Sequence, residues 1–230
     1  MSEKELKILS LFKDIEQGNK AAFDELFMLY HHKLLSLARQ YLKTLEGAEE
    51  ITSELFVKLW LKRQNLSQVT SPEVYLFISI KNASLNLIRS EKKRNSIFSP
   101  RLSAEEPLIQ EISGTADQEL YKLLDEAVAG LPEQRRIIFM LIKEDGLKSK
   151  AVAEILGISV RTVENHLYKA VKSLADTLSL YLGYHPQNRK RRRVAFQWLL
   201  SFFLLTSVSS LQNKTVFNIK AWHDEQRKIH

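Results

Sequence analysis

Five hydrogen-bonding side chains in the second half of the sequence are the residues best suited to recognising another molecule. They share one predicted helix and lie near its N-terminus: Arg161, Thr162, Asn165, His166 and Lys169. Guanidinium, hydroxyl, amide and ammonium groups bind base edges and phosphates, and the N-terminal end of a recognition helix enters the major groove. The cluster therefore predicts DNA binding, with the solvated face of an amphipathic helix as the alternative.

The residues around this cluster favour the DNA-binding interpretation. Residues 149–169 have the pattern of a helix-turn-helix, in which two short helices meet at a steep angle across a turn that contains glycine. We expect Gly157 to adopt the left-handed conformation in that turn and Ser159 to cap the second helix. Ser149 is expected to cap the first helix, and Ala153 is small enough for the second helix to cross close to it.

A second polar cluster lies on a predicted helix that ends near residue 93. Its members share one face or the C-terminal end of that helix: Lys81, Asn82, Asn86, Arg89, Lys92 and Lys93. Amides and cations together bind unstacked bases and their phosphates. Because Asn is a poor helix former, two in mid-helix favour a binding role over an ordinary polar surface.

Catalytic chemistry finds no support in the sequence. His31 and His32 are adjacent, so on a helix they point about 100° apart and do not share a metal ion from one face. Glu49 and Glu50 form a charge run rather than an acid and base pair, and Cys is absent. No glycine-rich phosphate loop or nucleophile set is present. We therefore expect a binding protein with no cofactor and no metal rather than an enzyme.

Helical periodicity and punctuation predict an all-α fold. Helices are expected over residues 20–42, 48–62 and 71–93, with Asn19 as a cap and Gly47 as a break. We expect two small helical domains with these limits: a helical bundle over 1–94, a flexible linker over 95–117, a helix-turn-helix domain over 118–182, and an extension over 183–230 that contains a hydrophobic helix.

Charge is distributed unevenly along the chain. Residues 1–182 carry 25 Lys and Arg against 25 Asp and Glu, whereas residues 183–230 carry 9 against 2, so the net charge of +7 lies in the tail. Residues 81–101 are basic and residues 102–133 are acidic. A basic patch followed by an acidic connector is typical of a chain in which one element contacts phosphate and the next does not.

Three segments resemble parts of one family of transcription factors. The stretch AVAGLPEQRRIIFMLIKEDGLKSKAVAEILGISVRTVENHLYKA (127–170) resembles the sigma-factor domain that binds the minus-thirty-five promoter element. AEEITSELFVKLW (48–60) resembles the helix that grips the polymerase clamp, and YLFISIKNASLNLIRSEKKR (75–94) resembles the helix that reads and melts the minus-ten element. Their order and the acidic linker resemble the extracytoplasmic-function group of the sigma-70 family, and within it the subgroup common in Bacteroidetes.

This resemblance implies a role for each cluster. Residues 161–169 would read the minus-thirty-five element, residues 81–93 would bind the minus-ten element, and the loop 64–71 would hold an extruded base. The residues facing core polymerase would be Glu49, Glu50, Glu54 and Phe56, with Ser53 standing where the family often has Gln. The implied partners are promoter DNA, core polymerase and an anti-sigma factor. The free protein would be a monomer in the cytoplasm.

Two other classes remain open at this stage. The segment ISVRTVENHLYKAVKSL also suits the output domain of a LuxR-type regulator, which binds an operator without acting as a sigma factor. A membrane-associated interaction protein without initiation activity is the third interpretation.

The C-terminal extension carries its own hypothesis. Five consecutive basic residues, 189–193, precede 18 residues without a charge, 194–211. A helix of that length spans about 27 Å, close to a hydrocarbon core of roughly 30 Å, and the basic run favours a cytoplasmic side before it. Three arrangements are expected for the extension: it tethers the protein to the inner membrane, it lies flat at the membrane surface, or it packs on the rest of the protein.

Overall fold

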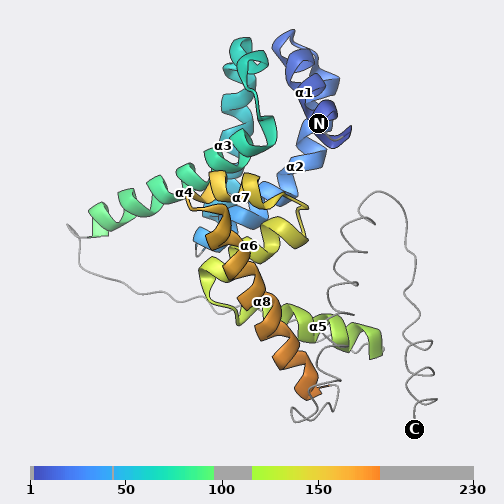
Figure 1. The fold of residues 1–230 in the computed structure, drawn as a ribbon. Helices are drawn as coiled ribbons and strands as arrows, with labels where there is room; N and C mark the ends of the chain where they lie inside the picture. The colour runs from blue at the N-terminus through green and yellow to red at the C-terminus, as the bar shows by residue number, and fades with distance from the viewer. Residues whose placement is uncertain (1–2, 43, 96–115, 182–230) are drawn as a thin grey trace. The chain divides into compact units, whose positions relative to one another are not determined.

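The computed structural model describes residues 3–42, 44–95 and 116–181. Every regular element in these ranges is helical (Figure 1), which confirms the all-α prediction. The elements are, in order, α1 Glu3–Glu16, α2 Lys20–Tyr41, α3 Leu45–Leu61, the 3₁₀ helix η1 Arg63–Gln68, α4 Pro72–Asn95, α5 Ala116–Ala129, α6 Glu133–Lys143, α7 Ser149–Leu156 and α8 Val160–Tyr181.

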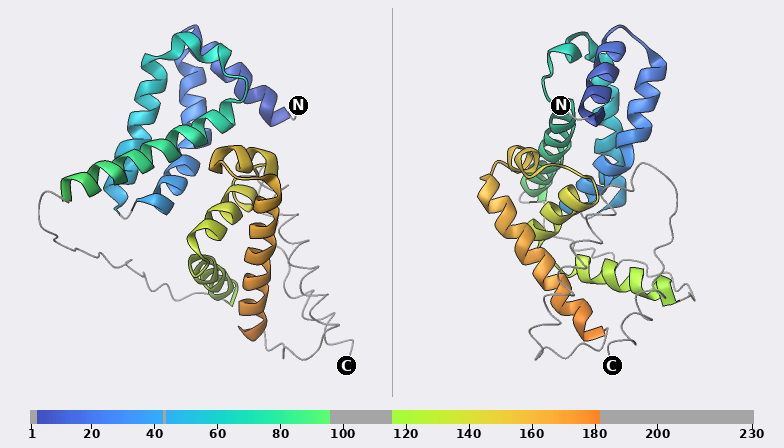
Figure 2. Two further views of the ribbon diagram at one scale, coloured as in Figure 1. Left: turned by 60° about the vertical axis from the view of Figure 1, so that its left-hand side comes forward. Right: turned by 45° about the vertical axis from the view of Figure 1, so that its right-hand side comes forward.

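The elements α1 to α4 form a bundle around an apolar core (Figure 2). Among its fully buried side chains are Phe12, Ile15, Leu26, Leu34 and Phe77. The entry to α2 is fixed locally, as predicted, because the Asn19 side chain accepts a hydrogen bond from the Ala22 amide at 3.2 Å.

One prediction for this bundle is wrong in detail. Gly47 does not break the chain: α3 begins at Leu45, and Thr44 caps it by accepting a hydrogen bond from the Gly47 amide at 3.3 Å. A Cβ at position 47 would come within 3.0 Å of that Thr44 hydroxyl oxygen, so the glycine allows the cap to close.

The helix-turn-helix forms where the sequence predicts it. Gly157 has φ +70°, and the Ile158 amide donates to the Ala153 carbonyl at 3.0 Å, which closes α7. Ser159 then caps α8 by accepting from the Thr162 amide at 3.1 Å. The prediction that Ser149 caps α7 is wrong, because Ser149 is already the first residue of that helix.

The described residues belong to one compact unit. Within it, α7 contacts α4 and α6 contacts α2. The expected linker over 95–117 lies almost wholly outside the described residues. The C-terminal extension, including the proposed hydrophobic helix over 194–211, lies outside them too. Among the helices that the structure describes, none combines the length and hydropathy needed to cross a membrane.

Candidate nucleic-acid interface

Helix α8, the second helix of the helix-turn-helix, exposes three of the five residues that were predicted to bind DNA. Arg161, Asn165 and Lys169 are exposed on its N-terminal half. Thr162 and His166 are half-buried: the Thr162 hydroxyl contacts the Ser159 hydroxyl at 2.8 Å, and the Nδ1 atom of His166 is buried without a hydrogen-bond partner. Thr162 and His166 are therefore less open to solvent than the other three residues of the cluster.

Further residues that the sequence interpretation missed share this face. Tyr168 is 58% exposed, and Glu164 and Lys172 are also exposed. Residues 161, 165, 168 and 172 follow the helical repeat, so a face centred on Arg161 includes them. That periodicity would have selected Tyr168 and Lys172 in place of Thr162 and His166.

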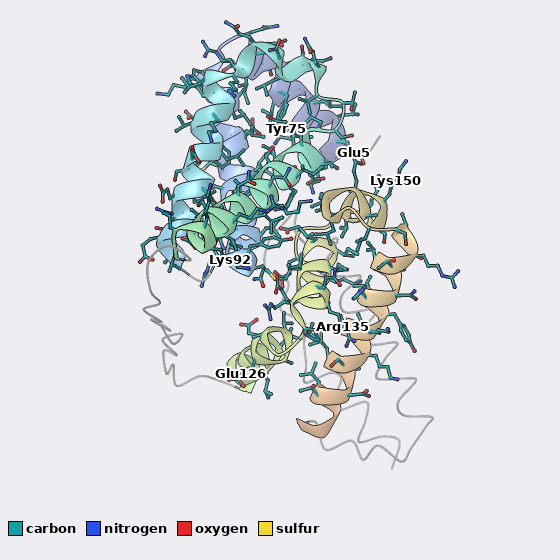
Figure 3. The ribbon with its side chains drawn as sticks, turned by 90° about the vertical axis from the view of Figure 1, so that its left-hand side faces the viewer. Glu5, Tyr75, Lys92, Glu126, Arg135 and Lys150 are labelled. Carbon is teal, nitrogen blue, oxygen red and sulfur yellow. The ribbon has the colours of Figure 1, made fainter. Side chains whose placement is uncertain are left out.

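The face of α4 carries most of the second cluster. Asn82, Asn86 and Arg89 are exposed, and the Arg89 guanidinium donates to the Asn86 side-chain oxygen at 3.2 Å. Lys92 and Lys93 are exposed in the last turn, where cations also complement the helix dipole; Figure 3 labels Lys92 there. These residues form a polar and basic strip suited to a nucleic-acid strand.

Lys81 differs from the other members of the cluster. It is half-buried, and its ammonium donates a hydrogen bond to the backbone carbonyl of Ile155 on α7. The structure therefore gives Lys81 a protein partner, while Asn82, Asn86 and Arg89 remain open to solvent.

The loop expected to hold an extruded base is a 3₁₀ turn with polar residues on its surface. Gln64, Asn65 and Gln68 are exposed, while Leu66 is 4% exposed and anchors the turn in the core. The Arg63 guanidinium lies 4.7 Å from the centre of the Trp60 ring and donates to the Trp60 carbonyl at 2.9 Å. The loop is thus built to present amide side chains from a fixed backbone.

The predicted polymerase-facing surface on α3 is exposed at its acids but not at its aromatic residue. Glu49, Glu50 and Glu54 are exposed. Phe56 is 3% exposed, so the expectation that it faces a partner is wrong. The large apolar residues exposed on this helix are instead Leu45, at 46%, Val57, at 55%, and Leu61, at 70%.

The carboxyl group of Asp145, in the loop between α6 and α7, has a raised pKa. Burial raises the pKa of Asp145 to about 7, against the lowering effect of Lys33, and Glu144 adds to the rise. The Asp145 backbone carbonyl accepts hydrogen bonds from Lys4 at 3.3 Å and Lys33 at 3.4 Å. Among the described residues, no group of three His, Cys, Asp or Glu side chains is arranged to hold a metal ion.

This geometry defines a class of protein. It is a helical DNA-binding protein with a helix-turn-helix and with a second polar face on helix α4 of the bundle. Two models of one family match these parts. Sigma-70 region 2 matches residues 26–94, and Sigma-70 region 4 matches residues 121–174.

Curated relatives narrow the family further. The chain is 23% identical over 184 residues to the ECF RNA polymerase sigma factor SigW of Bacillus subtilis, covering 76% of this chain and 98% of the relative. It is 23% identical over 173 residues to the ECF RNA polymerase sigma-E factor of Escherichia coli, covering 71% and 90%.

A solved structure shares the fold. The sigma factor RpoE of Bartonella quintana, crystallised with the anti-sigma factor NepR, has a TM-score of 0.54 at 18% identity and covers 68% of this chain and 96% of that one. The chain belongs to the extracytoplasmic-function group of the sigma-70 family and is an RNA polymerase sigma factor.

Proposed function

We propose that this sigma factor directs promoter-specific initiation by placing α8 in the minus-thirty-five major groove and α4 along the minus-ten strand. The observation that carries the proposal is the exposure of two separate polar faces, one in each segment that matches a sigma-70 model. Core polymerase supplies the chemistry of RNA synthesis.

On α8, Arg161, Asn165 and Lys169 are the proposed contacts to the minus-thirty-five element, joined by Tyr168 and Lys172. A guanidinium binds guanine and an amide binds adenine in the major groove, so the first two would specify bases, while the lysines would bind phosphates. Thr162 and His166 support the helix from behind. Their half-buried side chains argue for positioning rather than readout.

On α4, Asn82, Asn86 and Arg89 are the proposed contacts to the minus-ten element, with Lys92 and Lys93 binding phosphates beyond it. Unstacked bases need hydrogen-bonding edges and cations at close spacing, which this strip offers. Lys81 would join it only where its hydrogen bond to Ile155 is broken. The turn η1 would receive one extruded base through its amide side chains.

On α3, the proposed core-binding surface consists of the acids Glu49, Glu50 and Glu54 together with Val57 and Leu61. Exposed apolar side chains beside charges are typical of a protein interface, with an apolar centre and a polar rim. Phe56 stabilises this surface from within.

An anti-sigma factor is the proposed regulator, by analogy with the relative crystallised with NepR. We propose a cytoplasmic protein that is monomeric when free, with domain limits at 1–94, 95–117, 118–182 and 183–230. Tethering of the extension to the inner membrane stays a prediction.

A binding experiment distinguishes this proposal from a LuxR-type regulator. Promoter-containing genomic fragments are incubated with the protein, with core polymerase, and with both. We expect sequence-specific retention only when both are present. If the protein alone retained specific DNA fragments, and core polymerase did not increase that retention, the protein would be an operator-binding regulator instead.

A further inference from the structure

The N-terminal helix α1 holds the loop that follows α3. One carboxylate oxygen of Glu16, at the end of α1, accepts two hydrogen bonds from Ser67: from its hydroxyl at 2.8 Å and from its backbone amide at 3.3 Å. The two residues are 51 positions apart in sequence. The packing agrees with these hydrogen bonds, because η1 contacts α1 and the η1 residue Leu66 is buried.

The two hydrogen bonds fix both the backbone and the side chain of Ser67. A carboxylate that accepts from a hydroxyl and an amide of one residue restrains its position and its rotamer together. The loop is then anchored at Arg63 against Trp60, at Leu66 in the core and at Ser67 by Glu16. Beside these anchors the side chains of Gln64, Asn65 and Gln68 stay exposed.

We propose that Glu16 is a positioning residue for minus-ten base selection: it fixes Ser67 so that the amides of η1 meet an extruded base in one geometry. This rests on the proposed role of η1 as the base-holding loop. The Ser67 hydroxyl donates its only proton to Glu16 and therefore has no donor left for a base. A fixed loop discriminates between bases better than a mobile one, because a mobile amide adapts to the wrong base.

The residue that carries this role lies outside the segment matched by the region 2 model, which begins at residue 26. The proposal therefore extends the minus-ten site of this chain to a helix that the family match does not include. It makes α1 part of the specificity apparatus rather than only a cover for the core.

The test uses the full chain with core polymerase from the source bacterium. The template is a promoter at which the wild-type protein starts transcription, together with derivatives changed at each minus-ten base in turn. Initiation is measured for wild type, Glu16→Ala, Glu16→Gln, Ser67→Ala and the exposed control Glu3→Gln, with thermal melts of each protein.

We expect Glu16→Ala to lose about three- to tenfold in discrimination at one minus-ten position, from the loss of a charge-assisted pair at a partly exposed site. Discrimination at the minus-thirty-five element and affinity for core should not change. Ser67→Ala should lose discrimination at the same position, and Glu16→Gln should recover most of it because its amide oxygen still accepts. Glu3→Gln should behave as wild type.

Undiminished discrimination in both Glu16→Ala and Ser67→Ala would overturn the proposal, and so would an equal loss at every promoter base. If Glu16→Ala fails to fold, Ser67→Ala decides, since an exposed loop serine is removable without loss of the core. Absence of initiation by the wild-type protein with core would instead refute the proposed function itself, which separates the two failures.

Discussion

The rings of Phe27 on α2 and Phe56 on α3 lie 4.8 Å apart between their centroids and stand at 59° to each other. Phe23 meets Phe56 edge to face at 6.2 Å and meets Trp60 at 5.1 Å. Aromatic pairs in these geometries stabilise a fold beyond the area they bury. The seam between α2 and α3 is therefore an aromatic cluster that sets the surface of α3 from the inside.

We predict that Phe56→Ala destabilises the protein by about 3 to 5 kcal/mol, because it removes a fully packed ring and leaves a cavity. Urea unfolding followed by circular dichroism measures this. Val57→Ala, on the exposed neighbouring position, is the matched control and should stay within about 0.5 kcal/mol of wild type. Equal stability of the two variants would mean that Phe56 is not packed as the structure has it.

Binding to core polymerase should depend on the exposed side of α3. Val57→Asp combined with Leu61→Asp places charges where the proposed interface is apolar, and the affinity for core should fall by about tenfold or more. Co-purification and titration with labelled core measure the loss. The fold should be retained because neither side chain lies in the core.

Met28→Asp is the control for that variant, since Met28 on α2 is 80% exposed and lies outside the proposed surface. It should bind core as wild type does. Full retention of core binding by a folded Val57→Asp, Leu61→Asp protein would place the interface elsewhere.

Promoter readout should depend on the exposed face of α8. Arg161→Ala and Asn165→Ala are each expected to weaken promoter binding by about 1 to 3 kcal/mol. Each should also relax base selection at one minus-thirty-five position. Lys172→Ala should weaken all promoters alike and reduce the salt dependence. Initiation on a panel of minus-thirty-five variants distinguishes these outcomes, and unchanged selection after Arg161→Ala together with Asn165→Ala would remove α8 from the role.

Stability should depend on pH through Asp145. Its pKa of about 7 in the folded protein lies above the ordinary value of 3.8, so the folded state holds the proton more tightly than the unfolded state. The contribution of the protonated carboxyl is complete below about pH 4 and is lost as the pH rises toward 7. Asp145→Asn should remove this dependence and be the more stable protein at pH 8.

Urea unfolding of both proteins at pH 5, 6, 7 and 8 measures the effect, with the exposed Asp24→Asn as the control. We expect the difference in stability between Asp145→Asn and wild type to grow by about 2 to 3 kcal/mol between pH 5 and pH 8. A constant difference would show that Asp145 keeps an ordinary pKa.

Local sequence signals predicted local structure well. Asn19, Gly157 and Ser159 act through neighbours within five residues, so their types alone indicate a cap and a turn. The resemblance to known sigma factors pointed to a polar face on α4 and another on α8, and each of these faces has exposed side chains in the structure.

Contacts between distant elements were not predictable in this way. The burial of Phe56 depends on Phe23 and Phe27 of another helix, and a helical repeat on α3 alone does not specify which flank is covered. The hydrogen bonds between Glu16 and Ser67 join residues 51 positions apart, so the types of the two residues do not predict that they pair. For His166, residue chemistry suggested readout, but the side chain is half-buried and its Nδ1 atom is buried.

Start-site mapping decides whether this protein gives core polymerase its promoter selection. Genomic DNA from the source bacterium is transcribed by purified core polymerase with and without the full-length protein, and the 5′ ends of the products are sequenced. We expect discrete new start sites that share two upstream elements, and we expect these sites to be lost when α8 carries Arg161→Ala and Asn165→Ala. A pattern of start sites identical to that of core polymerase alone would contradict it.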